Sequence, residues 1–148
     1  MFRGRFETVV DGKGRTSLPA RYRENLISSD DNRMVLTQAL EPCLLAYPYS
    51  KWLEFEKKLS EAPSFDAHII RIKRLTVTSA MECPVDSHGR ILIPQLLRET
   101  AGITREVVWA GMVDYAEIWD AERFKQAFLS AQNEDKALLS KALADFGL

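Results

Sequence analysis

The sequence is poor in the residues that hold metals or form disulfides. Its 148 residues include two cysteines and two histidines, namely Cys43, Cys83, His68 and His88. No pair of them has the spacing of zinc ligands, and no C-x-x-C motif occurs. Because both cysteines lie in apolar, strand-like stretches, we expect buried and reduced thiols. The sequence therefore predicts no metal and no other cofactor.

Long apolar segments are also missing. The longest uncharged run, Pro42–Ser50, is far shorter than the roughly 20 residues that cross a bilayer as a helix. The N-terminal residues Met-Phe-Arg-Gly-Arg lack the apolar core of a signal peptide. We therefore expect a cytoplasmic protein without a membrane partner. Apolar residues still make up 46% of the chain, which is enough for one sizeable core.

The chain has no excess of charge of either sign. Lys and Arg total 20 and Asp and Glu total 21, so the net charge of −1 gives no global sign of a nucleic-acid-binding protein. The first 23 residues differ, because they contain six basic residues against only Glu7 and Asp11. The six are Arg3, Arg5, Lys13, Arg15, Arg21 and Arg23. This distribution predicts one basic face on an otherwise neutral protein.

One pattern occurs twice, and the rest of the chain is organised around it. The pattern is Asp-x-x-Gly-Arg-x-x-x-Pro-x-x-x-Arg, and its copies stand 75 positions apart. The first copy consists of Asp11, Gly14, Arg15, Pro19 and Arg23, and the second of Asp86, Gly89, Arg90, Pro94 and Arg98. Five identities at one fixed offset indicate an internal duplication.

Each copy has the residues of a hairpin followed by a short helix. The glycine suits a turn position with a positive backbone φ, the aspartate can accept hydrogen bonds from turn amides, and the proline suits the start of a helix. The predicted strand pairs are Phe6–Val10 with Thr16–Leu18 and Met81–Val85 with Arg90–Ile93, and the predicted helices are Ala20–Leu26 and Gln95–Ala101. Well-formed turns with solvated arginines would explain one copy, but the repetition favours a function.

The remaining segments predict a second hairpin in each copy and four further helices. The hairpins are Met34–Thr37 with Leu44–Tyr47 and Val107–Ala110 with Glu117–Trp119. The helices are Lys51–Ser60 capped by Ser50, the basic segment 65–79, Ala121–Ala131 capped by Asp120, and Glu134–Phe146. The basic segment could contact DNA, be solvated or contact another subunit. The last helix carries an apolar stripe that needs a partner surface, which a neighbouring subunit could supply.

Several of these motifs resemble those of the MraZ family, bacterial regulators with two SpoVT/AbrB-type modules. The resemblance rests on Phe2-Arg3-Gly4, on both Asp-x-x-Gly-Arg turns, on Ser17-x-Pro19-x-Arg21-Tyr22-Arg23 and on Pro42-Cys43-Leu44-x-x-Tyr47-Pro48, and it runs to about Phe124. It implies an α+β fold in which tandem AbrB-like, swapped-hairpin modules interleave into one pseudo-twofold β-barrel flanked by helices, with further helices at the C-terminus. The expected division is module 1 at 5–51, a helical connector at 52–79, module 2 at 80–123 and a C-terminal helical tail at 124–148.

The resemblance also implies a function. A member of this family is expected to be a non-enzymatic, DNA-binding transcriptional repressor of its own promoter and of the division and cell-wall gene cluster. It is expected to assemble into a homo-oligomeric ring, to bind repeated boxes in double-stranded promoter DNA and to associate with the nucleoid. No small-molecule substrate is expected.

Arginine chemistry suggests how DNA would be contacted. A guanidinium held at the base of a turn can bond guanine O6 and N7, while other basic residues bond phosphates. We assign Arg15 to a base, and Asp11 either orients it or forms a plain ion pair that fixes the hairpin. Phosphate or base contacts are assigned to Lys13, Arg3, Arg5, Arg21 and Arg23.

The second copy is expected to contribute less. It has His88 where the first has Lys13, and its net charge over residues 80–100 is near −1. We therefore assign Arg90 and Arg98 to secondary DNA contacts. Gly14, Asp86 and Gly89 are assigned structural roles in the turns.

Two alternatives have other functions. Asp86-Ser87-His88 contains the residue types of a hydrolase, but a Ser-His-Asp site needs them to converge from separate elements, whereas neighbours on a turn point apart. The stronger alternative is an interaction module of the same fold, such as an antitoxin-like subunit whose terminal helices bind a partner protein.

Overall fold

The computed structural model describes residues 1–148 and has an α+β fold, as predicted. The strands are β1 (Arg5–Val9), β2 (Arg15–Ser17), β3 (Arg33–Gln38), β4 (Leu44–Pro48), β5 (Met81–Pro84), β6 (Arg90–Leu92), β7 (Glu106–Gly111) and β8 (Ala116–Asp120). The helices are α1 (Ala20–Arg23), α2 (Tyr49–Glu61), α3 (Ala67–Thr76), α4 (Gln95–Ala101), α5 (Ala121–Gln132) and α6 (Lys136–Asp145), and a short 3-10 helix, η1, covers Ser28–Asp30.

The strands of the two copies are interleaved. Six strands form one antiparallel sheet in the order β1-β7-β8-β4-β3-β5, while β2 pairs separately with β6. Exchanging the equivalent strands of the two copies (β1 with β5, β2 with β6, β3 with β7, β4 with β8) reverses this order without otherwise changing it. The arrangement therefore has the pseudo-twofold symmetry that a duplication predicts. The sheet ends at β1 and β5, so the strand order does not by itself establish a closed barrel.

The predicted pairing of the first two strands within each copy is wrong. Asp11 N–H donates to the Arg15 carbonyl oxygen at 2.8 Å and closes the turn, but the strands diverge beyond it. β1 pairs with β7, and β5 pairs with β3. β2 and β6 pair with each other. Each of these strands thus finds its backbone partner in the other copy, which the local spacing of residues does not reveal. The second hairpin of each copy, β3 with β4 and β7 with β8, forms as predicted.

One core is shared by both copies. A cluster of 19 buried residues includes Tyr22 of α1 and Leu97 of α4, which occupy equivalent positions in the repeat. Tyr22 is packed edge-on against Phe2, Phe6 and Trp109. These contacts hold α1 and α4 against the sheet, and each helix directly follows one strand of the β2 and β6 pair.

Helix α2 is capped from a distant segment. It begins at Tyr49, and the predicted cap Ser50 lies inside the helix. The buried carboxylate of Asp30 accepts hydrogen bonds from Ser50 N–H at 2.7 Å and from Ile27 N–H at 2.8 Å. A negative charge is thereby placed at the positive end of the helix dipole. The capping group lies 20 residues upstream in the sequence, so local pattern could not identify it.

Three other helices are shorter than predicted. α1 ends at Arg23, and the residues up to Leu26 continue in separate turns, in which Leu26 N–H donates to the Arg23 carbonyl oxygen. α3 starts only after Asp66, whose carboxylate accepts hydrogen bonds from two N–H groups of the first turn. Asp135 caps α6 with one such hydrogen bond, which it accepts from the Ala137 N–H. Local carboxylates therefore set the starts of α3 and α6.

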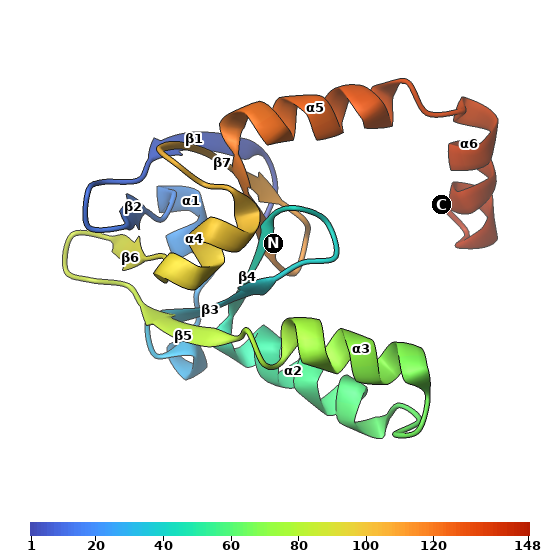
Figure 1. The fold of residues 1–148 in the computed structure, drawn as a ribbon, viewed down its shortest axis with the longest axis horizontal. Coiled ribbons are helices and arrows are strands. Elements are labelled where there is room, and N and C mark those ends of the chain that lie inside the picture. The colour runs from blue at the N-terminus through green and yellow to red at the C-terminus, as the bar shows by residue number, and fades with distance from the viewer.

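Helices α5 and α6 lead away from the sheet, with α6 at the far end (Figure 1). Asp120 caps α5 as predicted, since its carboxylate accepts the Arg123 N–H. Neither helix has a buried residue. The apolar stripe of α6, formed by Leu138, Leu139, Leu143 and Phe146, is between 46% and 82% exposed. No helix in the chain has the length and apolar character to span a membrane.

Candidate nucleic-acid interface

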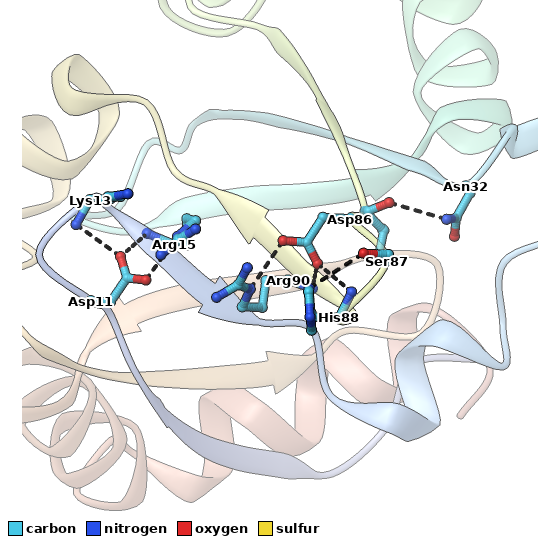
Figure 2. A network of polar contacts seen from close by, with 9 residues as sticks. Asp11, Lys13, Arg15, Asn32, Asp86, Ser87, His88 and Arg90 are labelled. Carbon is cyan, nitrogen blue, oxygen red and sulfur yellow. Dashed lines mark hydrogen bonds and ion pairs between the residues drawn. The ribbon is translucent and has the colours of Figure 1, made fainter.

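The first Asp-x-x-Gly-Arg turn fixes the side chain of Arg15. Asp11 Oδ1 accepts hydrogen bonds from the backbone N–H groups of Lys13 and Arg15, both at 2.9 Å, and Asp11 Oδ2 accepts the Arg15 Nε–H at 2.9 Å (Figure 2). Gly14 has a φ of 87°, which residues with a side chain rarely adopt. One carboxylate therefore orders both the backbone of the turn and its arginine, which combines the two roles proposed for Asp11.

The second turn repeats this arrangement. Asp86 Oδ1 accepts hydrogen bonds from the N–H groups of His88 and Arg90 at 2.8 and 2.9 Å, and Asp86 Oδ2 accepts the Arg90 Nε–H at 3.0 Å (Figure 2). Gly89 has a φ of 74°. Equivalent atoms are thus joined in both copies, although His88 stands where the first copy has Lys13.

These hydrogen bonds stabilise the charged form of both aspartates. The backbone N–H of Arg15 makes the largest contribution to lowering the pKa of the Asp11 carboxyl, and the N–H of Arg90 does the same for the pKa of Asp86; partial desolvation opposes both effects. Both ion pairs are about one third exposed, and such pairs add little to stability. Their main effect is therefore on the orientation of the arginines.

The two arginines lie on one face of the ribbon that β2 and β6 form. The register pairs Arg15 with Leu92, Thr16 with Ile91 and Ser17 with Arg90. Opposite residues in an antiparallel pair share a face, as do alternate residues along a strand. Thr16 and Ile91 are buried on the inner face. The outer face consequently presents both aspartate-held arginines, with Ser17 and Leu92 exposed beside them.

The two turns lie at opposite ends of this ribbon because β2 and β6 are antiparallel. Leu18 N–H donates to the Gly89 carbonyl oxygen, and Ile93 N–H donates to the Gly14 carbonyl oxygen, both at 2.9 Å. Each strand is thereby joined at its end to the turn of the other copy. Both turns therefore contribute an arginine to the same face of the ribbon.

The last arginine of each motif packs against the turn of the other copy. A Cβ atom added to Gly14 would lie 1.7 Å from Arg98 Nη1, and one added to Gly89 would lie 2.1 Å from Arg23 Nη1. The Arg98 guanidinium also donates a hydrogen bond to the Ile93 carbonyl oxygen. Sequence reasoning assigned Arg23 and Arg98 to DNA, whereas their guanidinium groups lie at the junction between the copies.

The other predicted basic residues have different surroundings. Arg3 and Arg21 line one open hollow of about 440 Å³ together with Met1, Tyr22, Asn25 and the acidic Glu24. The Arg5 guanidinium carbon lies 4.6 Å from the centre of the Phe128 ring on α5, a cation–π geometry. Lys13 is exposed in the first turn. The basic residues of the N-terminal segment therefore do not form a single cluster.

Sequence reasoning missed part of the ribbon. Thr8 Oγ1 and Thr16 Oγ1 share a hydrogen bond at 2.7 Å, which joins β1 to the inner face of β2. Leu92 is 53% exposed on the outer face, between hydrophilic neighbours. The repeat could have indicated that Leu92 is exposed, because Ser17 and Leu92 are equivalent positions and a polar residue at position 17 implies an exposed position 92.

The residues of the alternative sites are used differently. Cys43 and Cys83 are buried and unpaired as predicted, and burial raises the pKa of the Cys83 thiol to about 12. Ser87 Oγ lies 3.4 Å from His88 Nδ1, but the Asp86 carboxylate bonds to backbone N–H groups and to Arg90. Asp86 therefore does not orient the imidazole as a Ser-His-Asp site requires.

Comparison with known proteins identifies relatives of the whole chain. A family model described as "MraZ protein, putative antitoxin-like" matches residues 1–75 and 77–146. A protein of Geotalea daltonii named Transcriptional regulator MraZ is 39% identical over 161 aligned positions that cover 100% of both chains. A protein of the same name from Enterobacter sp. is 39% identical, again over 100% of both. One from Thioalkalivibrio sulfidiphilus is 40% identical over 82% of this chain and 81% of its own.

The fold and the site define a class of protein in which two interleaved copies of one module present paired Asp-Arg turns on a shared ribbon. The matches span both copies of that module. The chain belongs to the MraZ family, as the sequence motifs predicted.

Proposed function

We propose that the protein is a DNA-binding transcriptional regulator that represses its own promoter and the division and cell-wall gene cluster. One observation carries this proposal: Arg15 and Arg90 are each held by an aspartate on the exposed face of one two-stranded ribbon. The name of the relatives, Transcriptional regulator MraZ, agrees with it.

The ribbon suits the major groove in size and in chemistry. The major groove of B-DNA admits a two-stranded β-ribbon, and an arginine can donate two parallel hydrogen bonds to guanine O6 and N7. Arg15 and Arg90 use Nε–H for their aspartates, and their Nη groups make no hydrogen bond within the protein. These Nη groups are free for a base. The aspartates also restrict the arginine side chains beforehand, which lowers the entropy lost on binding.

The remaining basic residues would supply affinity through phosphates. Lys13 lies at one end of the ribbon, and Arg3 with Arg21 could bind one phosphate in their shared hollow. Arg5 could contribute an edge of its guanidinium while its face stacks on Phe128. Such contacts position the protein on DNA but do not select a sequence.

We infer that the two copies contribute unequally. Their turns have the same hydrogen bonds, so the difference lies in the surrounding residues: residues 1–23 contain six basic and two acidic residues, whereas residues 80–100 contain two arginines and three acidic residues. Arg15→Ala should therefore weaken DNA binding more than Arg90→Ala does. Equal losses for the two variants would show that the second copy is a full partner.

The proposal includes assembly into a homo-oligomeric ring, which the uncovered apolar stripe of α6 supports. A ring would place identical ribbons side by side, so we expect directly repeated promoter boxes about one helical turn apart, bound with avidity. Such a protein would associate with the nucleoid in the cytoplasm and would need no small-molecule substrate. Equally tight binding of one isolated box by a monomer would exclude this part of the proposal.

Binding to defined DNA tests the proposal directly. Fluorescence anisotropy would compare a duplex from upstream of the protein's own gene with a scrambled duplex, across a salt series. Wild type should prefer its own promoter, and Arg15→Ala should reduce that preference roughly 5- to 150-fold, because a bidentate base contact is worth about 1–3 kcal/mol. Lys58→Ala, which removes an exposed charge on α2, is the matched control. If wild type binds neither duplex at moderate salt, the DNA proposal fails.

A second candidate is an antitoxin-like interaction module. The family description contains that term, and the exposed stripe on α6 could bind a partner protein. This candidate predicts that Leu139→Glu abolishes binding of a protein partner while Arg15→Ala leaves it intact. The reverse pattern, with DNA as the ligand, favours the regulator.

A further inference from the structure

The last arginine of the repeated motif has a role that its place in the sequence does not suggest. We propose that Arg98 and Arg23 are positioning residues, each of which holds the Asp-x-x-Gly-Arg turn of the other copy at a fixed place on the ribbon. This inference rests on the proposed DNA contact of Arg15 and Arg90. It assigns Arg98 and Arg23 to the geometry of that site instead of to phosphates.

A guanidinium group of the other copy fills the space next to the Cα atom of each turn glycine. Arg98 Nη1, Cζ and Nη2 would lie 1.7, 2.7 and 3.3 Å from a Cβ atom on Gly14. Arg23 Nη1, Cζ and Nε would lie 2.1, 2.7 and 3.3 Å from one on Gly89. Each guanidinium therefore occupies the volume that a side chain at the turn would need. The two contacts are related by the pseudo-twofold symmetry, so one structural rule accounts for both.

The Arg98 contact is part of a closed set of interactions. Its guanidinium donates to the Ile93 carbonyl oxygen, and Ile93 N–H donates to the Gly14 carbonyl oxygen. The same arginine thus touches Gly14 and binds the residue that is hydrogen-bonded to Gly14. On the backbone side, the Arg98 carbonyl oxygen accepts the Ile103 N–H at the end of α4. Movement of α4 and the adjoining Ile93 relative to the first turn would break both the Arg98 packing on Gly14 and the hydrogen bond from Ile93 to Gly14.

The two arginines differ in exposure, so we expect the loss of Arg98 to have a larger effect than the loss of Arg23. Arg98 is half-buried, and Arg23 is exposed. A guanidinium committed to a neighbouring turn and a carbonyl oxygen has fewer donors left for a phosphate. Because Gly14 adjoins Arg15, a displaced turn would also move the Asp11 carboxylate that aims Arg15. Loss of Arg98 should therefore act on the first turn, which carries most of the proposed affinity.

A double-mutant cycle without DNA tests the positioning contact. The variants are Gly14→Ala, Arg98→Ala and the pair, and the readout is the midpoint of urea unfolding at constant slope. In the wild-type background the new methyl group must displace the flexible end of the Arg98 side chain and also imposes backbone strain at positive φ, so the midpoint should fall by more than strain alone would cause. In the Arg98→Ala background only the backbone strain at positive φ remains, and the fall should be smaller. Additive shifts would overturn the proposal.

The equivalent double-mutant cycle at the second turn keeps the proposal testable if a variant of the first turn fails to fold. Because Arg23 is exposed, the cycle of Arg23→Ala with Gly89→Ala should shift the unfolding midpoint less than the Arg98 cycle does. The coupling between the two substitutions should have the same sign. Arg21→Ala combined with Gly89→Ala is the control, because Arg21 lies on the same short helix but is not among the nearest atoms to Gly89. Additivity is expected for that control. Coupling for Arg21 as strong as for Arg23 would refute a specific contact.

DNA binding provides a second, separate readout. For the promoter duplex, the slope of log K against log salt is negative, and Lys13→Ala should make it less steep by about 1, as loss of one phosphate contact does. Arg98→Ala should weaken binding at every salt concentration with an unchanged slope, and Arg98→Lys should not restore the affinity, because an ammonium lacks the planar fork. A slope reduced by about 1 for Arg98→Ala would identify a phosphate contact and overturn the proposal. Absence of any DNA binding by wild type would refute only the proposed function, and the unfolding cycles would still decide this inference.

Discussion

Tyr22 offers a test of what holds the motif helix α1 to the core. It is fully buried, its hydroxyl donates to the Gly4 carbonyl oxygen at 2.8 Å, and its ring packs edge-on against three aromatic rings. The question is whether the hydrogen bond or the ring supplies the greater part of the stability. Tyr22→Phe removes only the hydrogen bond, and Tyr22→Leu removes the aromatic contacts as well.

The structure gives a small expected cost for Tyr22→Phe. The Gly4 carbonyl oxygen also accepts the Gly111 N–H at 2.8 Å, so removal of the hydroxyl leaves no buried acceptor without a partner. A hydrogen bond lost under these conditions costs about 1 kcal/mol. For a chain of this size, that lowers the melting temperature by about 3 °C.

Tyr22→Leu should cost considerably more. The ring centroid lies 5.0 Å from that of Phe2, 5.2 Å from that of Phe6 and 6.1 Å from that of Trp109. Edge-to-face pairs add about 0.5–1.5 kcal/mol each beyond the area they bury, so loss of three such pairs together with the hydrogen bond costs about 3 kcal/mol; truncation of a buried aromatic residue to alanine, which removes more volume, costs about 3–5 kcal/mol. The melting temperature should fall by about 10 °C.

Urea unfolding and scanning calorimetry of the two variants and wild type would measure both costs. The DNA affinity of Tyr22→Phe should stay close to that of wild type, which controls for displacement of α1. If Tyr22→Phe were as unstable as Tyr22→Leu, the hydroxyl and not the ring would anchor α1, and the reasoning from the second donor to Gly4 would be wrong.

Three further predictions concern pH and assembly. Burial raises the pKa of Tyr22 to about 12 from an ordinary value of 10.0. The stability that the neutral Tyr22 side chain contributes is therefore complete below pH 10 and is lost as the pH rises towards 12. In urea titrations, Tyr22→Phe should lose less stability than wild type between pH 10 and 12. Their hydrogen bonds lower the pKa values of Asp11 and Asp86 below the ordinary 3.8, so the stability that these carboxylates contribute is present above that pH and is lost below it. The double variant with Asn at both positions should therefore show a weaker dependence of unfolding on pH between pH 6 and 2. An unchanged dependence would contradict the role given to these carboxylates. Leu143→Glu on the exposed stripe of α6 should reduce the assembly observed by analytical ultracentrifugation, whereas Ala144→Glu on the opposite side should not.

The sequence was sufficient for local features whose cause is local. The turns were predictable because an aspartate, a glycine with positive φ and an arginine stand within five positions, and the hydrogen bonds of the aspartate side chain all lie inside that interval. The N-cap of α5 at Asp120 was predictable for the same reason. The family resemblance added the interleaving of modules, which strand patterns alone did not predict.

Features with distant partners were not predictable in this way. The residues of β1 would suit pairing with β2, but they pair with β7, about 100 positions later. The cap of α2 comes from Asp30, and the side chain over Gly14 comes from Arg98. An arginine that contacts a ligand and an arginine packed on a glycine of another segment are identical in sequence, so the packing of Arg98 on Gly14 could not be predicted from the motif. Only the fold separates these two uses.

The pattern of pairing has a consequence for how the site is built. β1 and β5 each find a backbone partner only in the other copy, the ribbon takes one strand from each copy, and the shared core draws on both. Each turn environment therefore depends on the other copy, because the N–H groups that bond the carbonyl oxygens of Gly14 and Gly89 and the guanidinium groups packed on these glycines belong to the opposite motif. Joining both copies in one chain fixes their ratio at one to one and gives each a high effective concentration for the other. It also allows the two turns to diverge in sequence, as Lys13 and His88 have, while the hydrogen bonds that hold Arg15 and Arg90 remain the same. A duplicated chain can in this way keep one geometry and adjust the strength of its two contacts separately.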